Sequence, residues 1–178
     1  MRYALIVSLT IVFACLSAQK LQWEVDSFEG DSILTTDFEI LSKYSINGNH
    51  GTALAVTGYS DSAVLRFKME PTKLYNTFRE GDVLKIKMGS GQIIELPATE
   101  LVVVAGTGDG GVGWPISGKP GFSLVFDLTA DDLVLLGDQE IVMFQLTTEN
   151  GYINADVKSK RAKKVRELIE MFRREGGY

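Results

Sequence analysis

"GDVLKIKMGSGQIIEL", residues 81–96, alternates apolar and charged side chains before a glycine turn. Leu84, Ile86 and Met88 fall on one face of an extended strand, and the two lysines between them fall on the other. The Gly-Ser-Gly turn leads into a second apolar run, which predicts an antiparallel β-hairpin. A hairpin with one apolar face must bury that face against a further layer, so this stretch predicts a β-rich core.

The same alternation recurs along most of the 178 residues. It predicts further strands, with turns between them that are rich in glycine and asparagine. The turn at 47–51 contains His50, the only histidine, and the turn before 152 contains Asn150 and Gly151. The expected strands cover 21–25, 33–41, 52–56, 63–69, 140–146 and 152–157.

Two short helices are expected between strands. Pro71 stands at a favourable first-turn position in "EPTKLYNTF", residues 70–78. In "LTADDLVLLG", Thr129 is a candidate N-cap with Asp132 three residues later, which is the spacing of a capping box. Gly137 is the expected stop of that helix.

Two segments share the plan strand, short helix, strand, turn, strand: residues 65–96 and 124–156. An offset of 59 aligns Leu65 with Leu124 and Phe67 with Phe126. We therefore expect an α+β fold, mainly antiparallel β, with sandwich-like packing of two similar strand–helix–hairpin units and a C-terminal amphipathic helix.

The expected C-terminal helix covers residues 158–174 and holds eight basic and two acidic residues. The rest of the chain is therefore strongly acidic, because the net charge of the whole is −5. An acidic body argues against nucleic acid as a partner. A basic amphipathic helix can lie on a membrane or dock a partner, but this one follows a strand directly, which favours packing on the sheet. Its apolar stripe consists of Ala162, Val165, Leu168, Ile169 and Phe172.

The first 18 residues predict a secretory signal peptide. Arg2 precedes an apolar run, and the small residues Ser17 and Ala18 follow it. Residues 19–178 would then form one exported domain, periplasmic or secreted, without a transmembrane helix. An alternative uses Cys15, the only cysteine, in "VFAC": this loosely resembles a lipobox, and lipidation there would give an outer-membrane lipoprotein.

Residues 105–113, "AGTGDGGVG", contain the G-x-G-x-x-G spacing of a dinucleotide-binding turn. Such a site needs a helix directly after the glycines, because the helix N-terminus holds the pyrophosphate. Pro115 and Pro120 follow instead and exclude that helix. We therefore expect no nucleotide and no other cofactor.

The long segment 106–121 reads as a loop between strands, and such loops often carry function. Trp114 offers a flat aromatic face there, with Lys119 nearby. These two residues are the candidate ligand-binding residues, although a tryptophan in such a loop more often covers the edge of the core.

No constellation for catalysis stands out. One histidine and no cysteine beyond Cys15 exclude the usual zinc sites, and no serine lies in a nucleophile elbow. Asp131 and Asp132 are adjacent carboxylates, but they stand in a first helical turn, where acids stabilise the helix dipole. We expect no metal, no catalytic residue and no enzyme.

Four cations alternate with apolar residues in two of the expected strands: Arg66, Lys68, Lys85 and Lys87. If those strands pair, the cations would line one exposed face as an anion-binding stripe. The favoured alternative is a solvated face with Glu95 and Glu70 as cross-strand partners.

"DSAVLRFKM…GDVLKIKMGSGQIIEL", followed by "FDLTADDLVLLGDQEIVMFQLTTENGYINADV" and a basic helix, resembles small exported proteins of Bacteroidetes-type bacteria over about residues 61–175. That family carries no assigned activity, so the resemblance implies location and build but no chemistry. We expect a non-catalytic cell-envelope or secreted module that binds an unknown ligand or protein partner. A structural subunit of an envelope assembly, or a hydrolase of envelope polymers, are the alternatives.

Overall fold

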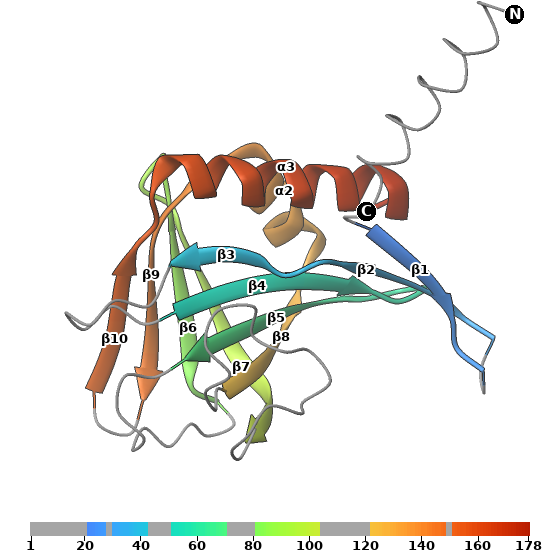
Figure 1. Ribbon diagram of the computed structural model, residues 1–178, viewed down its shortest axis with the longest axis horizontal. Helices are drawn as coiled ribbons and strands as arrows, with labels where there is room; N and C mark the ends of the chain where they lie inside the picture. Colours follow the sequence, from blue (N-terminus) through green and yellow to red (C-terminus); the bar gives the residue numbers. More distant parts are fainter. Residues whose placement is uncertain (1–20, 28–29, 43–50, 71–80, 104–121, 149–150) are drawn as a thin grey trace, which may run out of the picture.

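The computed structural model describes residues 21–27, 30–42, 51–70, 81–103, 122–148 and 151–178. Its main element is one antiparallel ten-stranded sheet in the order β1-β2-β4-β5-β8-β7-β6-β9-β10, with β3 beside β4 (Figure 1). The strands are β1 Leu21–Val25, β2 Ser32–Thr36, β3 Glu39–Ser42, β4 Gly51–Gly58, β5 Ala63–Glu70, β6 Val83–Met88, β7 Ile93–Val103, β8 Phe122–Leu128, β9 Ile141–Thr148 and β10 Gly151–Asp156.

The long strand β7 joins two differently directed parts of the sheet. Its first half pairs with β6, its second half pairs with β8, and the register with β8 shifts between Ala98 and Glu100. Such an irregularity bends a strand, and Figure 1 shows β6, β9 and β10 running across the direction of β2 to β5. The core fills the concave side, where Phe67 of β5 meets Phe144 of β9 edge-on, with ring centroids 5.2 Å apart.

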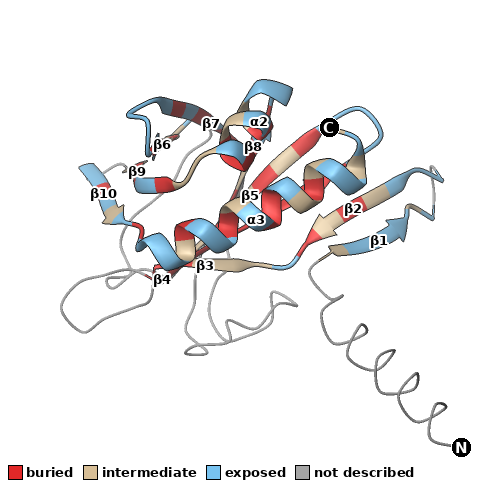
Figure 2. Ribbon diagram, turned by 90° about the horizontal axis from the view of Figure 1, so that it is seen from above, coloured by how far each residue is buried: buried red, intermediate tan, exposed pale blue. Residues whose placement is uncertain are grey.

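Helices α2 (Ala130–Asp138) and α3 (Ser159–Gly176) lie together over this core. In Figure 2, buried positions recur at helical spacing along α3. The expectation that α3 packs on the sheet is confirmed, because the five residues of its apolar stripe are all buried. Arg161 fastens the first turn by donating from Nη1 to the carbonyl of Leu41 at 3.2 Å. No helix in the described ranges has both the length and the hydropathy to cross a membrane.

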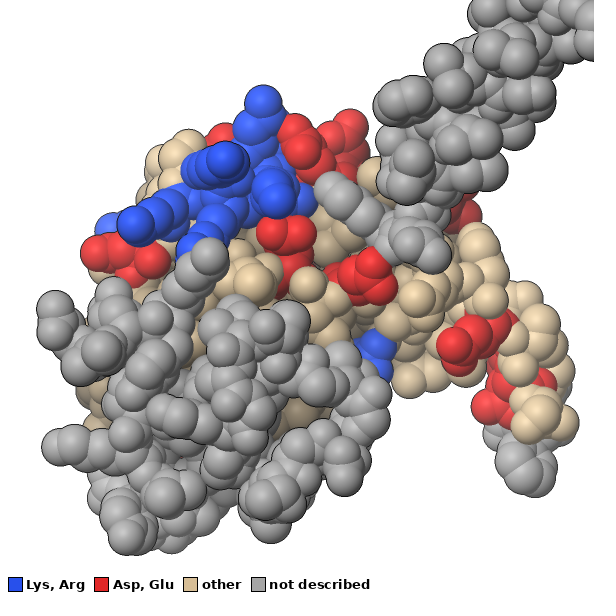
Figure 3. All heavy atoms as spheres, viewed as in Figure 1, with Lys and Arg blue, Asp and Glu red and all other residues tan. Residues whose placement is uncertain are grey.

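The outward face of α3 carries many lysines and arginines, which gather over its N-terminal half (Figure 3). These side chains are solvated. Lys163 lies 3.9 Å from Glu167, and Lys164 lies 3.9 Å from Glu39. Exposed ion pairs of this kind contribute little to the free energy of unfolding. The basic face of α3 therefore resembles the solvated face of an ordinary surface helix.

Helix α2 begins as the sequence predicts and ends differently. Thr129 Oγ1 accepts from the Asp132 amide at 3.1 Å, and Asp132 Oδ2 accepts from the Thr129 amide at 3.0 Å, which forms the capping box. Gly137, the expected stop, lies inside the helix and is buried. A Cβ there would come 3.0 Å from Arg173 Nη1, so this glycine makes room for Arg173 of α3 rather than ending α2.

Tyr178 fastens the end of α3 to the β4–β5 turn. Its ring stacks on Phe172 with centroids 5.2 Å apart and an interplanar angle of 8°. Its hydroxyl donates to the carbonyl of Tyr59 and to that of Ser62, the latter at 3.2 Å. A Cβ on Gly58 would lie 2.8 Å from Phe172 Cζ, so the close approach of these rings requires glycine.

The single strand expected over 33–41 is wrong, because the chain forms β2 and β3 with a break between them. At the break, Thr36 Oγ1 accepts from the Val56 amide at 2.8 Å and replaces a backbone acceptor. Strand β2 then pairs with the last residues of β4, and β3 pairs with the first ones. The hairpins over 83–96 and 140–157 are confirmed.

The α+β class with a mainly antiparallel sheet is confirmed. Sandwich-like packing of two units is not confirmed, because one open sheet continues from β1 to β10 and both parts share β7. The expected signal peptide and the helix over 70–78 lie outside the described residues, apart from Glu70.

Candidate functional site

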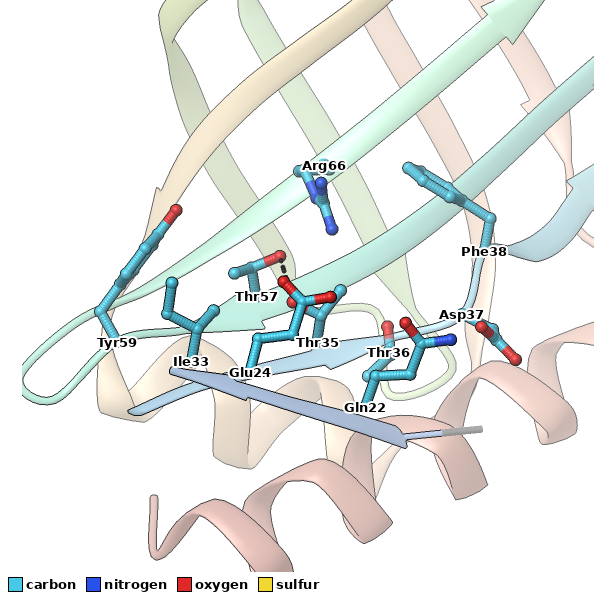
Figure 4. A pocket seen from close by; sticks show the side chains of 10 residues that line it. All are labelled: Gln22, Glu24, Ile33, Thr35, Thr36, Asp37, Phe38, Thr57, Tyr59 and Arg66. Atoms are coloured by element: carbon cyan, nitrogen blue, oxygen red, sulfur yellow. Dashed lines mark hydrogen bonds between the residues drawn. The ribbon is translucent and has the colours of Figure 1, made fainter. Parts of the chain in front are cut away.

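A groove of about 590 Å³ opens on the outer face of the sheet, over β1, β2, β4 and β5 (Figure 4). Arg66 faces this side because it alternates with Leu65 and Phe67, which point into the core. We call this hollow the Arg66 groove. Its lining consists of Gln22, Glu24, Ile33, Thr35, Thr36, Asp37, Phe38, Thr57, Tyr59 and Arg66.

Strand pairing brings the polar side of the groove together. Gln22 of β1 lies opposite Thr35 of β2, which lies opposite Thr57 of β4. Thr35 Oγ1 donates to Thr57 Oγ1 at 3.5 Å, the dashed line in Figure 4. An amide and two hydroxyls therefore form a row across three strands, each able to donate and accept hydrogen bonds.

Two cations of β5 share one aromatic ring beside this row. The Phe38 ring centroid lies 5.6 Å from Arg66 Cζ and 4.0 Å from Lys68 Nζ. Both cations are therefore close enough to interact with the ring's π electrons. Phe38 stands in the break between β2 and β3, so the break places the ring over β5.

The charges of this pair are not neutralised within the described ranges. Arg66 Nε is buried and has no hydrogen-bond partner there, and no carboxylate forms an ion pair with Arg66 or Lys68. Burial, and secondarily the charge of Arg66, lower the pKa of Lys68 below its ordinary value. Partial burial costs each cation some hydration, and the Phe38 ring is the contact that the described residues offer in return.

The other two cations of the hypothetical stripe behave differently. Strands β5 and β6 do not pair, because β8 and β7 lie between them, so a single stripe of four cations is wrong. Lys85 Nζ lies 2.6 Å from Glu95 Oε1, which is the cross-strand pair that the alternative predicted. Lys87 is exposed, and the Glu70 side chain lies outside the described residues.

The residues proposed from sequence for binding, Trp114 and Lys119, lie outside the described residues, as do Cys15 and His50. Asp132 serves in the capping box, as its position in a first turn predicted. Across the described ranges, no three histidine, cysteine, aspartate or glutamate side chains gather in a way that could hold a metal ion.

A smaller hollow of about 140 Å³ lies beside β1 and the C-terminal residue. Trp23 and Tyr178 contribute to it, and Trp23 keeps 57% of its surface exposed. Among the residues that the structure describes, no charged side chain lines this hollow. The Arg66 groove therefore combines volume, aromatic faces and unneutralised charge in a way that this second hollow does not.

Searches for relatives give no match to a family model, to a curated protein or to a solved structure. The fold and the groove define an α+β protein with an open, bent antiparallel sheet and a half-buried cation pair on its outer face.

Proposed function

We propose that this protein is a non-catalytic binding module of the bacterial cell envelope, periplasmic or secreted, that takes a small ligand or a segment of a protein partner in the Arg66 groove. The observation that carries the proposal is the pair Arg66 and Lys68. Both cations are half-buried, and neither has a carboxylate partner in the described ranges. Arg66 lines the groove, and Lys68 stands beside it at the Phe38 ring. An anionic group in the groove would replace the hydration that Arg66 loses on partial burial, and this would favour binding of the anion.

The location rests on the signal-like residues 1–18 and on the resemblance to exported proteins. Lipidation at Cys15 is the alternative, and intact mass of the exported protein separates the two. The mass of a chain that starts near Gln19 supports a soluble form. The mass of a chain that starts at Cys15 and carries a diacylglycerol supports the lipoprotein.

We also propose that residues 65–96 and 124–156 are two copies of one unit. Support comes from the register of β5 with β8, in which Leu65 lies opposite Phe126 and Phe67 opposite Leu124. The offset of 59 aligns Leu65 with Leu124 and Phe67 with Phe126. Each of these residues of β5 therefore lies opposite the residue of β8 that is aligned with the other. Two strands related by a two-fold axis pair in this way.

A thermal-shift screen with glycans and peptides tests the binding function. We expect at least one ligand that raises the melting temperature of the wild type and of Lys85→Gln, but not that of Arg66→Gln. Lys85→Gln is the matched control, because it removes one cation of the outer face that is already paired with Glu95. Ligands that stabilise all three proteins equally would contradict the groove, and recovered hydrolysis products would favour the hydrolase.

A further inference from the structure

The Arg66 groove has an aromatic side chain at each end, which bears on the class of ligand. In Figure 4, Tyr59 and Phe38 lie at opposite ends, and the polar side chains lie between them. Tyr59 keeps 41% of its surface exposed, so its ring is available to a ligand. The volume of about 590 Å³ falls within the range of about 300–1,000 Å³ that small-molecule sites occupy.

The side chains between the rings suit a ligand with many hydroxyl groups. Gln22, Thr35 and Thr57 can each donate and accept, and Glu24 can accept from two hydroxyls. A sugar presents hydroxyls around its edge and an apolar C–H face above and below. Aromatic rings at the ends and hydrogen-bonding groups along the middle therefore match a chain of sugar rings better than a wholly apolar ligand.

Arg66 offers the groove one place for a negatively charged group. A guanidinium presents a planar fork that binds a carboxylate through two parallel hydrogen bonds, and Arg66 lines the groove without an ion-pair partner in the described ranges. Glu24 and Asp37 also line the groove. These two carboxylates would repel a phosphate group with nearly two charges more strongly than a singly charged carboxylate.

Resting on the proposed binding function, we infer that the Arg66 groove binds an acidic oligosaccharide, with a uronic acid carboxylate on the guanidinium of Arg66. Lys68 does not line the groove, but its Nζ lies 4.0 Å from the centroid of the same Phe38 ring and adds a second positive charge nearby. Tyr59 and Phe38 receive the sugar faces, and Gln22 and the threonine hydroxyls receive the sugar hydroxyls.

Isothermal titration calorimetry with three probes tests this inference: tetragalacturonate, tetramannuronate and a hyaluronan tetrasaccharide. We expect at least one to bind the wild type and Lys85→Gln with equal affinity. Its methyl ester, which keeps every sugar ring but loses the charge, should bind at least tenfold more weakly. Arg66→Gln should bind the acid at least tenfold more weakly than the wild type. Arg66→Lys should show most of that loss of affinity, because an ammonium lacks the planar fork. Added salt should weaken binding of the acid more than binding of the ester.

Failure of all three acids to bind overturns the inference. Equal affinity of an acid and its ester overturns the role of the carboxylate, and inorganic phosphate binding as tightly as the acids overturns the saccharide class. None of these outcomes decides the proposed binding function, which the thermal-shift screen tests separately. In that screen a neutral glycan or a peptide can still stabilise the wild type and not Arg66→Gln. Thermal melting of each variant shows that it is folded before titration.

Discussion

Replacing Phe172 by alanine should lower the free energy of unfolding by about 3–5 kcal/mol. The ring is fully buried on the inner face of α3 and stacks on Tyr178 at 5.2 Å. It also reaches the backbone of β4 at Gly58, where the missing Cβ leaves it room. The helix, the strand and the terminal tyrosine surround the ring, so little can collapse into the cavity. The stacked pair adds about 0.5–1.5 kcal/mol, which places the expected loss in the upper part of the range.

Urea unfolding followed by circular dichroism measures this loss, with an unchanged slope as the sign that only stability differs. Arg174→Ala is the matched control on the same helix, because Arg174 is exposed and its ion pair is with the adjacent Glu175. We expect that variant within about 0.5 kcal/mol of the wild type. A loss below about 1 kcal/mol for Phe172→Ala would refute the role of α3 as a core element. A protein truncated before Lys158 that still melts like the full chain would refute it as well.

Three smaller perturbations test other contacts by the same unfolding assay. Gly58→Ala should lower the free energy of unfolding by about 1–3 kcal/mol, because its Cβ would overlap the Tyr178 and Phe172 rings. The control Gly89→Ala, whose Cβ would have its nearest contact at 3.6 Å, should lower it by no more than about 0.5 kcal/mol. Equal losses would contradict the close contact at Gly58. Thr129→Ala should cost about 0.5–2 kcal/mol by removing the capping box of α2, and no measurable loss would count against it. Burial raises the pKa of Tyr178, so the neutral hydroxyl stabilises the fold fully below pH 10. That contribution should disappear as pH rises through 10 toward the raised pKa, and Tyr178→Phe should lack this alkaline loss; identical pH profiles would contradict it.

Elements with a local signal were predicted well from sequence. Strand β1 has the bounds expected from "LQWEV", the β6–β7 hairpin follows its glycine turn, and the buried stripe of α3 is the predicted one. Each depends on periodicity and turn chemistry within a few residues. The break between β2 and β3 was missed because it depends on a contact outside the local sequence. The Thr36 hydroxyl accepts a hydrogen bond from the amide of Val56, twenty residues away.

Strand order and the groove were beyond local reasoning. Strand β5 lies between β4 and β8 and does not pair with β6, so cations with the same alternation have different surroundings in the fold. The Arg66 groove draws its lining from residues between 22 and 66, and only the pairing of four strands brings these together. Sequence alternation marked Arg66 and Lys68 as outward-facing, but nothing local indicated that Phe38 would lie over both.

The central claim is that Arg66 and Lys68 form an unneutralised cation pair, and the pKa of Lys68 tests it most directly. NMR titration of the lysine side chains, with Lys68→Gln to assign the signal, measures that pKa in the wild type and in Arg66→Gln. We predict a wild-type value below the ordinary 10.5, and a partial return toward 10.5 in Arg66→Gln, since the burial of Lys68 remains. An ordinary pKa in the wild type, or one that Arg66→Gln leaves unchanged, would contradict the account.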